Sequence, residues 1–133
     1  MLINYMKYTI FLQRKAERYI AQRERIITRA TRTSTHTTDD KVQTTPKKDA
    51  MEINAVAIAD LSIIIEDYIR RIAYRTAKAQ DIINHSELDF TARQILELRY
   101  VKCYRWGKVA KLSGYSVRHA QRIHDTAILE LEG

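Results

Sequence analysis

The sequence is poor in the residues that would commit a chain to a special structural class. Its 133 residues include one cysteine, Cys103, one proline and three glycines. A single cysteine excludes an intrachain disulfide framework and a multi-cysteine zinc finger. The low glycine and proline content excludes collagen-like and Pro-rich chains, and no apolar stretch reaches the roughly 18 residues of a membrane span. What remains has the composition of an ordinary globular protein, with 45% hydrophobic and 29% charged residues.

Motifs for catalysis and for secretion are also missing. The sequence has no Gly-rich phosphate loop and no G-x-S-x-G elbow, the signatures of nucleotide binding and of α/β-hydrolases. A zinc motif needs closely spaced His and Cys pairs, and the four histidines lack them: His36, His85, His119 and His124. We therefore expect no enzyme, no metal and no cofactor, with these histidines on the surface. The N-terminus lacks the charge-then-apolar order of a signal peptide, so we expect a cytoplasmic protein in which Cys103 is a buried thiol.

Positive charge is the most informative feature of the composition. Lys and Arg total 23 against 16 Asp and Glu, a formal net charge of +7. The excess lies at the two ends, because residues 1–30 carry seven bases and two acids and residues 91–133 carry eight and four. Residues 51–90 are acidic, with four bases and seven acids. Basic surfaces of this kind favour nucleic acid or an anionic membrane surface as partners. Of these two we expect nucleic acid and no membrane.

Hydrophobic periodicity divides the chain into segments. We predict a basic amphipathic helix within residues 1–29, starting at residue 2, whose buried face recurs at three- and four-residue steps: Tyr5, Tyr8, Leu12, Ala16, Tyr19, Ile20 and Ile26. Residues 30–48 are rich in Thr and Ser and nearly free of apolar side chains. Thr is a poor helix former because its hydroxyl competes for backbone groups. We therefore expect a loop or linker there, ending near Pro46.

A second long helix is predicted over residues 49–84. Asp49 and Glu52 have the spacing of a capping box, and a heptad pattern follows. Its apolar seam comprises Ile58, Leu61, Ile65, Tyr68 and Ile72. Such a seam is typical of a helix packed along another helix. The partner is either the N-terminal helix, in an antiparallel hairpin, or the same helix of a second subunit in a homodimer.

The last segment, residues 89–133, reads as several short helices. Thr91 and Gln94 form a capping box for the first. A helix near residues 105–112 is followed by Gly114, which can adopt the left-handed conformation that ends a helix. Ser116 is a good N-cap for the final helix. Two short helices joined by a glycine-containing turn are typical of a helix-turn-helix.

The chemistry of the final helix suits DNA. Its face away from the core would present Arg118, Gln121, Arg122 and Asp125. Arg can bond guanine O6 and N7, and Gln can bond adenine N6 and N7. We expect phosphate contacts from Arg105, Lys108, Lys111, Ser116 and His119. Aromatic residues here, Trp106 above all, are expected in the core rather than as a stacking platform for bases.

The stretch from residue 95 to 131 resembles region 4 of bacterial sigma factors. The matching elements, in order, are Leu98-Arg99-Tyr100, Trp106, Val109-Ala110, Leu112, Gly114-Tyr115-Ser116, Ile123, His124 and Ala127-Ile128. The Trp, the Tyr-Ser pair and the His-x-x-Ala spacing resemble more closely the small phage regulators of Gram-positive bacteria, including RinA-like and ArpU-like late-gene activators. Lys41-Val42-Gln43-Thr44-Thr45-Pro46 looks like a further element of those relatives. Ala120 departs from the resemblance, because a Val or Ile is usual at that position.

The resemblance implies an all-α protein in which a long helical hairpin, or a dimerising helix, precedes a sigma region 4-like helix-turn-helix. It implies base contacts from Val117, Arg118, Gln121 and Arg122. The expected function is a phage-encoded, sequence-specific transcriptional regulator that binds double-stranded DNA at a late or packaging-gene promoter with host RNA polymerase. The other sigma regions are missing, so a full sigma factor is not expected. Two alternatives stay open: a small-terminase-like packaging component, and a module that binds RNA polymerase or a host defence factor.

Overall fold

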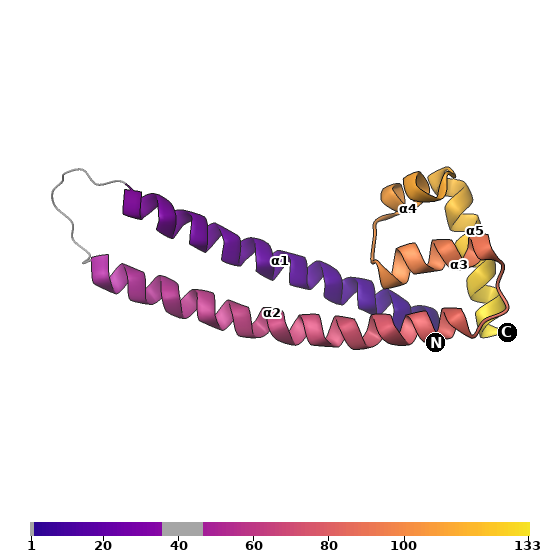
Figure 1. Cartoon of the computed structure of the whole chain (residues 1–133), viewed down its shortest axis with the longest axis horizontal. Helices are drawn as coiled ribbons and strands as arrows, with labels where there is room; N and C mark the ends of the chain where they lie inside the picture. The colour runs from indigo at the N-terminus through magenta and orange to yellow at the C-terminus, as the bar shows by residue number, and fades with distance from the viewer. Residues whose placement is uncertain (1, 36–46) are drawn as a thin grey trace. The chain divides into compact units, whose positions relative to one another are not determined.

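The structure is a computed structural model that describes residues 2–35 and 47–133, and within them it contains helices but no strand. In chain order the elements are α1 (Leu2–Thr35), α2 (Lys47–Asn84), α3 (Phe90–Leu96), the π-helical turn η1 (Glu97–Val101), α4 (Trp106–Ser113) and α5 (Val117–Glu132) (Figure 1). The expected all-α class is confirmed. In the described part of the chain, no helix is long and apolar enough to cross a membrane.

The chain divides into two compact units. One unit combines Met1–Gln13 with Arg70–Gly133, and the other is Arg14–Ile69. The start of α1 and the end of α2 therefore share a unit with the C-terminal helices. This division differs from the expected segments, in which residues 89–133 stood as a separate domain.

In the unit Arg14–Ile69, α1 and α2 pack antiparallel. The Tyr19 and Tyr68 rings lie 5.6 Å apart, and the Arg23 guanidinium donates a 3.1 Å hydrogen bond to Ser62 Oγ. Arg23, which follows Tyr19 in α1, thus contacts Ser62, which precedes Tyr68 in α2, as the antiparallel arrangement requires. The expected seam residues on this side are buried or half-buried: Ile58, Leu61, Ile65 and Tyr68. Of the two partners left open for this seam, the structure shows α1 of the same chain.

In the other unit, Met1–Gln13 with Arg70–Gly133, all of the helices contribute to the core. Its main cluster of buried residues comprises Met6, Ala79, Ile83, Leu88, Ala92, Leu96, Tyr100, Ala127 and Ile128. A second, smaller cluster joins α3, α4 and α5 through Ile95, Val109 and Ala120, which are each fully buried. This second cluster fixes how α5 packs against α4, and so it positions the exposed face of α5.

Arg75 of α2 is held by hydrogen bonds to α1. Its Nε donates to Thr9 Oγ1 and its Nη2 donates to the Tyr5 carbonyl, both at 3.1 Å. Its guanidinium also lies over the Tyr5 ring, 3.9 Å from the centroid. Because a guanidinium carries several donors in a fixed plane, it satisfies a carbonyl and a hydroxyl at once. A charged residue is therefore compatible with this helix contact.

The buried face of α1 differs from the expected one near its start. Tyr8 was expected to be buried but is 46% exposed, while Met6 and Thr9 are almost completely buried. Thr9 tolerates burial because its hydroxyl donates to the Tyr5 carbonyl at 3.2 Å and accepts from Arg75. A polar residue with both hydrogen bonds made behaves as a small core residue, which a hydrophobicity pattern does not detect.

The predicted loop over residues 30–48 is wrong at both ends. Residues 30–35 continue α1 and residues 47–48 begin α2, whereas residues 36–46 lie outside the described residues. Thr31 fits in the helix because its hydroxyl donates to the Ile27 carbonyl at 2.9 Å, one turn back. Thr costs a helix only a few tenths of a kcal/mol, so composition alone overstated the break.

Two predicted helix caps are also wrong. Since α2 begins at Lys47, Asp49 lies inside its first turn, where a carboxylate still interacts favourably with the helix dipole. Thr91 does not cap α3 either. The cap is Asp89, which has an extended backbone and whose carboxylate Oδ1 accepts the Ala92 N–H at 2.8 Å.

Candidate nucleic-acid interface

The turn between α4 and α5 has the conformation that the sequence predicts. Gly114 adopts a left-handed φ of 82° and its N–H donates to the Ala110 carbonyl at 2.9 Å. Ser116 caps α5, because its hydroxyl accepts the His119 N–H at 3.1 Å. Both predictions are confirmed. A left-handed glycine followed by an N-cap serine lets the chain end one helix and start the next within three residues, 114 to 116.

Small residues let α4 and α5 approach each other. Ala120 has no exposed surface and packs with Val109 and Ile95. Trp106 is half-buried beside this cluster rather than at its centre. Although Ala120 is smaller than the Val or Ile usual at this position, the packing here is complete, because neighbouring aromatic and aliphatic side chains fill the space around it.

The structure exposes the predicted DNA contacts. Among the base-reading candidates, Arg118 and Arg122 are exposed, Val117 is 41% exposed and Gln121 is half-buried. The phosphate candidates are all exposed: Arg105, Lys108, Lys111, Ser116 and His119. None of these residues belongs to a buried cluster, so their side chains can reach a partner without disturbing the core.

This part of the chain is uniformly basic. Between Glu97 and Asp125 the sequence contains no carboxylate and seven cations: Arg99, Lys102, Arg105, Lys108, Lys111, Arg118 and Arg122. Except for Arg99, each of these cations is exposed. A stretch with one sign of charge attracts a polyanion.

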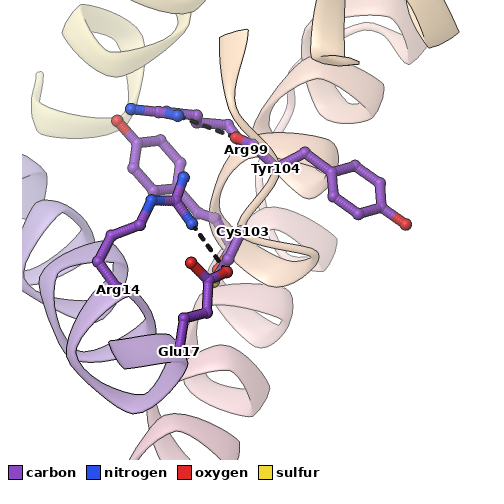
Figure 2. A network of polar contacts seen from close by, with 6 residues as sticks. Arg14, Glu17, Arg99, Cys103 and Tyr104 are labelled. Carbon is purple, nitrogen blue, oxygen red and sulfur yellow. Dashed lines mark hydrogen bonds and ion pairs between the residues drawn. The ribbon is translucent and has the colours of Figure 1, made fainter. Parts of the chain in front are cut away.

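Arg99 is the exception because it holds the backbone before α4. Its Nη1 donates to the Tyr104 carbonyl at 2.9 Å, as Figure 2 shows, and its guanidinium lies 4.8 Å from the Trp106 ring centroid. Lys108 is positioned from the same loop, with Nζ 4.0 Å from the Tyr104 ring centroid. Arg99 therefore has a structural role, and the Tyr104 ring orients Lys108.

The segment that leads into α4 has an irregular backbone that the sequence does not predict. Residues 97–101 form a π-helical turn, and Cys103 follows with a positive φ of 59°. The Tyr104 N–H donates to the Leu98 carbonyl at 3.0 Å, which closes this turn. Cys103 is 5% exposed, so the expected buried thiol is confirmed. A non-glycine residue in this conformation costs about 1–2 kcal/mol, which the surrounding packing must offset.

His124 corrects a sequence prediction, because it is buried rather than surface-facing. The Tyr100 hydroxyl lies 2.6 Å from His124 Nε2, and Nδ1 lies 2.9 Å from Asp125 Oδ1. An ionised carboxylate only accepts hydrogen bonds, so Nδ1 carries the proton and Nε2 accepts from Tyr100. This chain of hydrogen bonds ties η1 to α5.

Burial sets the titration of this group of side chains. It lowers the pKa of His124 below 6.5, an effect that the hydrogen bond to Asp125 opposes. Burial also raises the pKa of Tyr100 to about 12. Both groups are therefore neutral at physiological pH, and the contact between them joins η1 to α5.

A shallow hollow of about 360 Å³ lies beside α5 and marks one limit of the basic surface. Its lining includes Arg122 and His119 from the predicted interface. It also includes two carboxylates, Asp89 and Glu130. A polyanion would be repelled by those acids, so we place the edge of the basic surface at Arg122.

Tyr115 is a candidate contact that sequence reasoning missed. It was expected in the core, but it is 37% exposed in the turn and its ring lies 4.9 Å from the His119 ring. A tyrosine hydroxyl can bond a phosphate oxygen. The neighbours Gly114 and Ser116 could have predicted this exposure, because they indicate a tight turn and a residue inside such a turn seldom reaches the core.

No protein-family model, no curated protein and no solved structure matches this chain. Within residues 2–35 and 47–133, no group of three His, Cys, Asp or Glu side chains is placed to hold a metal ion. The geometry and charge of the α4–α5 surface are therefore the features of this chain that bear on its function.

Proposed function

We propose that this protein is a sequence-specific DNA-binding regulator that reads DNA with α5. The observation that carries the proposal is the α4–α5 pair. Its turn, capped by Ser116, leads into an exposed helical face with Arg118 and Arg122, within a stretch that has no carboxylate between Glu97 and Asp125. An α-helix fits the major groove of B-DNA, and Arg is the commonest reader of guanine there.

The proposed mechanism separates base reading from phosphate binding. Arg118, Gln121 and Arg122 hydrogen-bond base edges, and Val117 contacts a thymine methyl group. Lys108, Lys111 and Arg105 neutralise phosphates beside the groove. The N-terminus of α5 adds its partial positive charge close to a phosphate. Phosphate contacts fix the register of the protein, and base contacts supply its sequence preference.

The biological setting of the proposal comes from the resemblance of residues 95–131 to sigma region 4 and to RinA-like and ArpU-like activators. On that basis the protein acts in a bacterial host at a phage late or packaging-gene promoter, with host RNA polymerase as a further partner. No catalytic step is part of the proposal.

A DNA-packaging role is the second candidate. It is favoured by exposed aliphatic side chains on α2, among them Met51, Val56 and Ile63, which are 60–70% exposed. Small terminase subunits also combine a helix-turn-helix with a helical oligomerisation segment. A packaging subunit would form a ring, whereas a regulator would be a monomer or a dimer.

The test is a selection of duplex DNA from a random pool with the full chain, followed by titrations over a salt series. We expect an enriched sequence that binds at least about a thousandfold more tightly than random duplex. The double variant Arg118→Ala/Arg122→Ala should abolish that preference. The matched control, Arg18→Ala/Arg25→Ala, removes the same charge from exposed positions of α1 and should change binding less than about twofold.

Either of two results would reject the proposal. The pool fails to yield an enriched sequence, or the control variant weakens binding as much as the α5 variant does. The second result would make positive charge alone responsible for binding, without a reading helix.

A further inference from the structure

Two surfaces of this chain lie outside the proposed DNA interface and have opposite charge. Residues 49–69 of α2 contain five acids and no Lys or Arg. Residues 1–13 and 70–80 contain five cations and no acid. The first segment belongs to one compact unit and the second pair of segments belongs to the other.

The acidic surface consists of Glu52, Val56, Asp60 and Ile63 on α2. Their spacing of three and four residues places them along one face of the helix. Val56 is 60% exposed and Ile63 is 66% exposed, while Leu61 on the seam is buried. Glu52 and Asp60 are exposed as well. Aliphatic side chains that are this exposed and rimmed by charge mark interaction sites.

The basic surface consists of Tyr8 and Phe11 on α1 with Arg70, Tyr74 and Lys78 on α2. The Tyr8 and Phe11 rings stack with centroids 5.7 Å apart, and Phe11 and Tyr74 are 51% and 66% exposed. A groove of about 430 Å³ runs between the two helices, lined by Tyr8, Leu12, Arg70, Arg71, Tyr74 and Arg75. Tyr, Phe and Arg are enriched, and Asp and Glu depleted, at the centre of protein interfaces.

We propose that the acidic surface of one copy of this chain binds the basic surface of a second copy, forming a homodimer. Val56 and Ile63 of one copy contact the aromatic rings and the groove of the other, and Asp60 pairs with Arg70. In the proposed dimer the exchange is reciprocal, because the acidic surface of each copy binds the basic surface of the other, as two-fold symmetry requires. This interface differs from the seam of Ile58, Leu61 and Ile65, which packs within the chain.

A second copy accounts for more of the observations than a nucleic acid does. A nucleic acid could pair phosphates with Arg70 and Lys78 and stack bases on Tyr74. It would leave Val56 and Ile63 exposed, and the acids beside them would repel it. Only a partner with both an acidic aliphatic face and a basic aromatic face satisfies the two surfaces together.

Charge reversal tests the proposal, with sedimentation velocity of the full chain over a concentration series as the measurement. Wild-type protein should be a dimer. Asp60→Arg and Arg70→Asp should each raise the dimer dissociation constant by about a hundredfold, since each places like charges opposite each other twice. Circular dichroism should show unchanged helicity, because both positions are exposed.

The two variants should then repair each other. In an equimolar mixture of Asp60→Arg and Arg70→Asp chains, every contact between unlike chains joins opposite charges, so a heterodimer should form. The double variant Asp60→Arg/Arg70→Asp should form a homodimer again. The control reversals, Glu87→Arg and Arg25→Asp, lie at exposed positions outside both surfaces and should leave the dissociation constant unchanged.

Three results would overturn the proposal. The wild-type chain remains monomeric throughout the concentration series, the mixture of the two variants stays monomeric, or the control reversals disrupt the dimer equally. Binding of single-stranded oligonucleotide that Arg70→Asp abolishes, in a chain that is always monomeric, would assign the basic surface to nucleic acid instead.

Discussion

The two compact units of this protein use the same secondary structure in different ways. The unit Arg14–Ile69 contains two helices and a single seam, in which Ala16, Leu61 and Ile65 are buried. The other unit packs parts of α1 and α2 with three short helices around a broader core. A two-helix seam follows from periodicity alone, whereas a multi-helix core depends on turns, caps and irregular backbone that place each element.

The largest expected effect is the difference in stability between truncating a buried isoleucine and truncating an exposed one. Ile95 has no exposed surface, whereas Ile53 in the other unit is 65% exposed. We expect Ile95→Ala to lower the free energy of unfolding by about 2–5 kcal/mol. Ile53→Ala should change it by less than about 0.5 kcal/mol. Urea unfolding of both variants measures the difference, and equal effects would contradict the core assigned to α3, α4 and α5.

The glycines of α4 and its turn should respond in opposite directions to alanine. Gly114 has a φ of +82° and Gly107 lies in α4, and an added Cβ would meet nothing within 4 Å at either position. Gly114→Ala should therefore destabilise by about 1–2 kcal/mol through backbone strain alone. Gly107→Ala should stabilise by up to about 1 kcal/mol through helix propensity. Thermal unfolding distinguishes them, and the same sign for both would show that the turn is not as described.

Stability should depend on pH through His124. Its folded pKa lies below the ordinary 6.5, so protons bind more readily to the unfolded chain. The contribution is fully present above about pH 6.5 and is lost as the pH falls toward the folded pKa. Urea midpoints should therefore decrease from about pH 7.5 to pH 5.5. His124→Gln should reduce that slope, and a slope identical to wild type would remove His124 as its cause.

These predictions bear on how far a sequence can specify such a fold. Ser116 and Gly114 were predictable because an N-cap and a left-handed C-cap are local properties. The seam through Leu61 and Ile65 was predictable because a heptad pattern can be recognised in the sequence without knowing which helix packs against it. The ends of α1 and α2 were not, since a few Thr residues cost little once a helix has formed.

The features that sequence reasoning missed depend on contacts between distant residues. The π-helical turn at residues 97–101 and the positive φ of Cys103 are imposed where α3 must lead into α4. His124 is buried because Tyr100, 24 positions away, supplies a hydrogen-bond partner for its ring. The candidate DNA-contacting residues were predicted from residue type and periodicity, but their exposure is a property of the folded unit.

The smallest expected effect concerns Lys108, one of the proposed phosphate contacts. Lys108→Ala should weaken binding to selected and random duplex alike, and should reduce the slope of log K against log salt by about 0.9. Arg25→Ala, an exposed position of the other unit, should leave the slope unchanged. Identical slopes for wild type and Lys108→Ala would remove this lysine from the interface.

The central claim is that α5 reads bases, and the ratio of affinities for selected and random duplex tests it most directly. For Arg122→Ala and Gln121→Ala we expect a loss of about 1–3 kcal/mol on the selected sequence. Affinity for random duplex should change little, so the ratio falls. A loss of the same size on both DNAs would contradict the account, because α5 would then be only part of a basic surface.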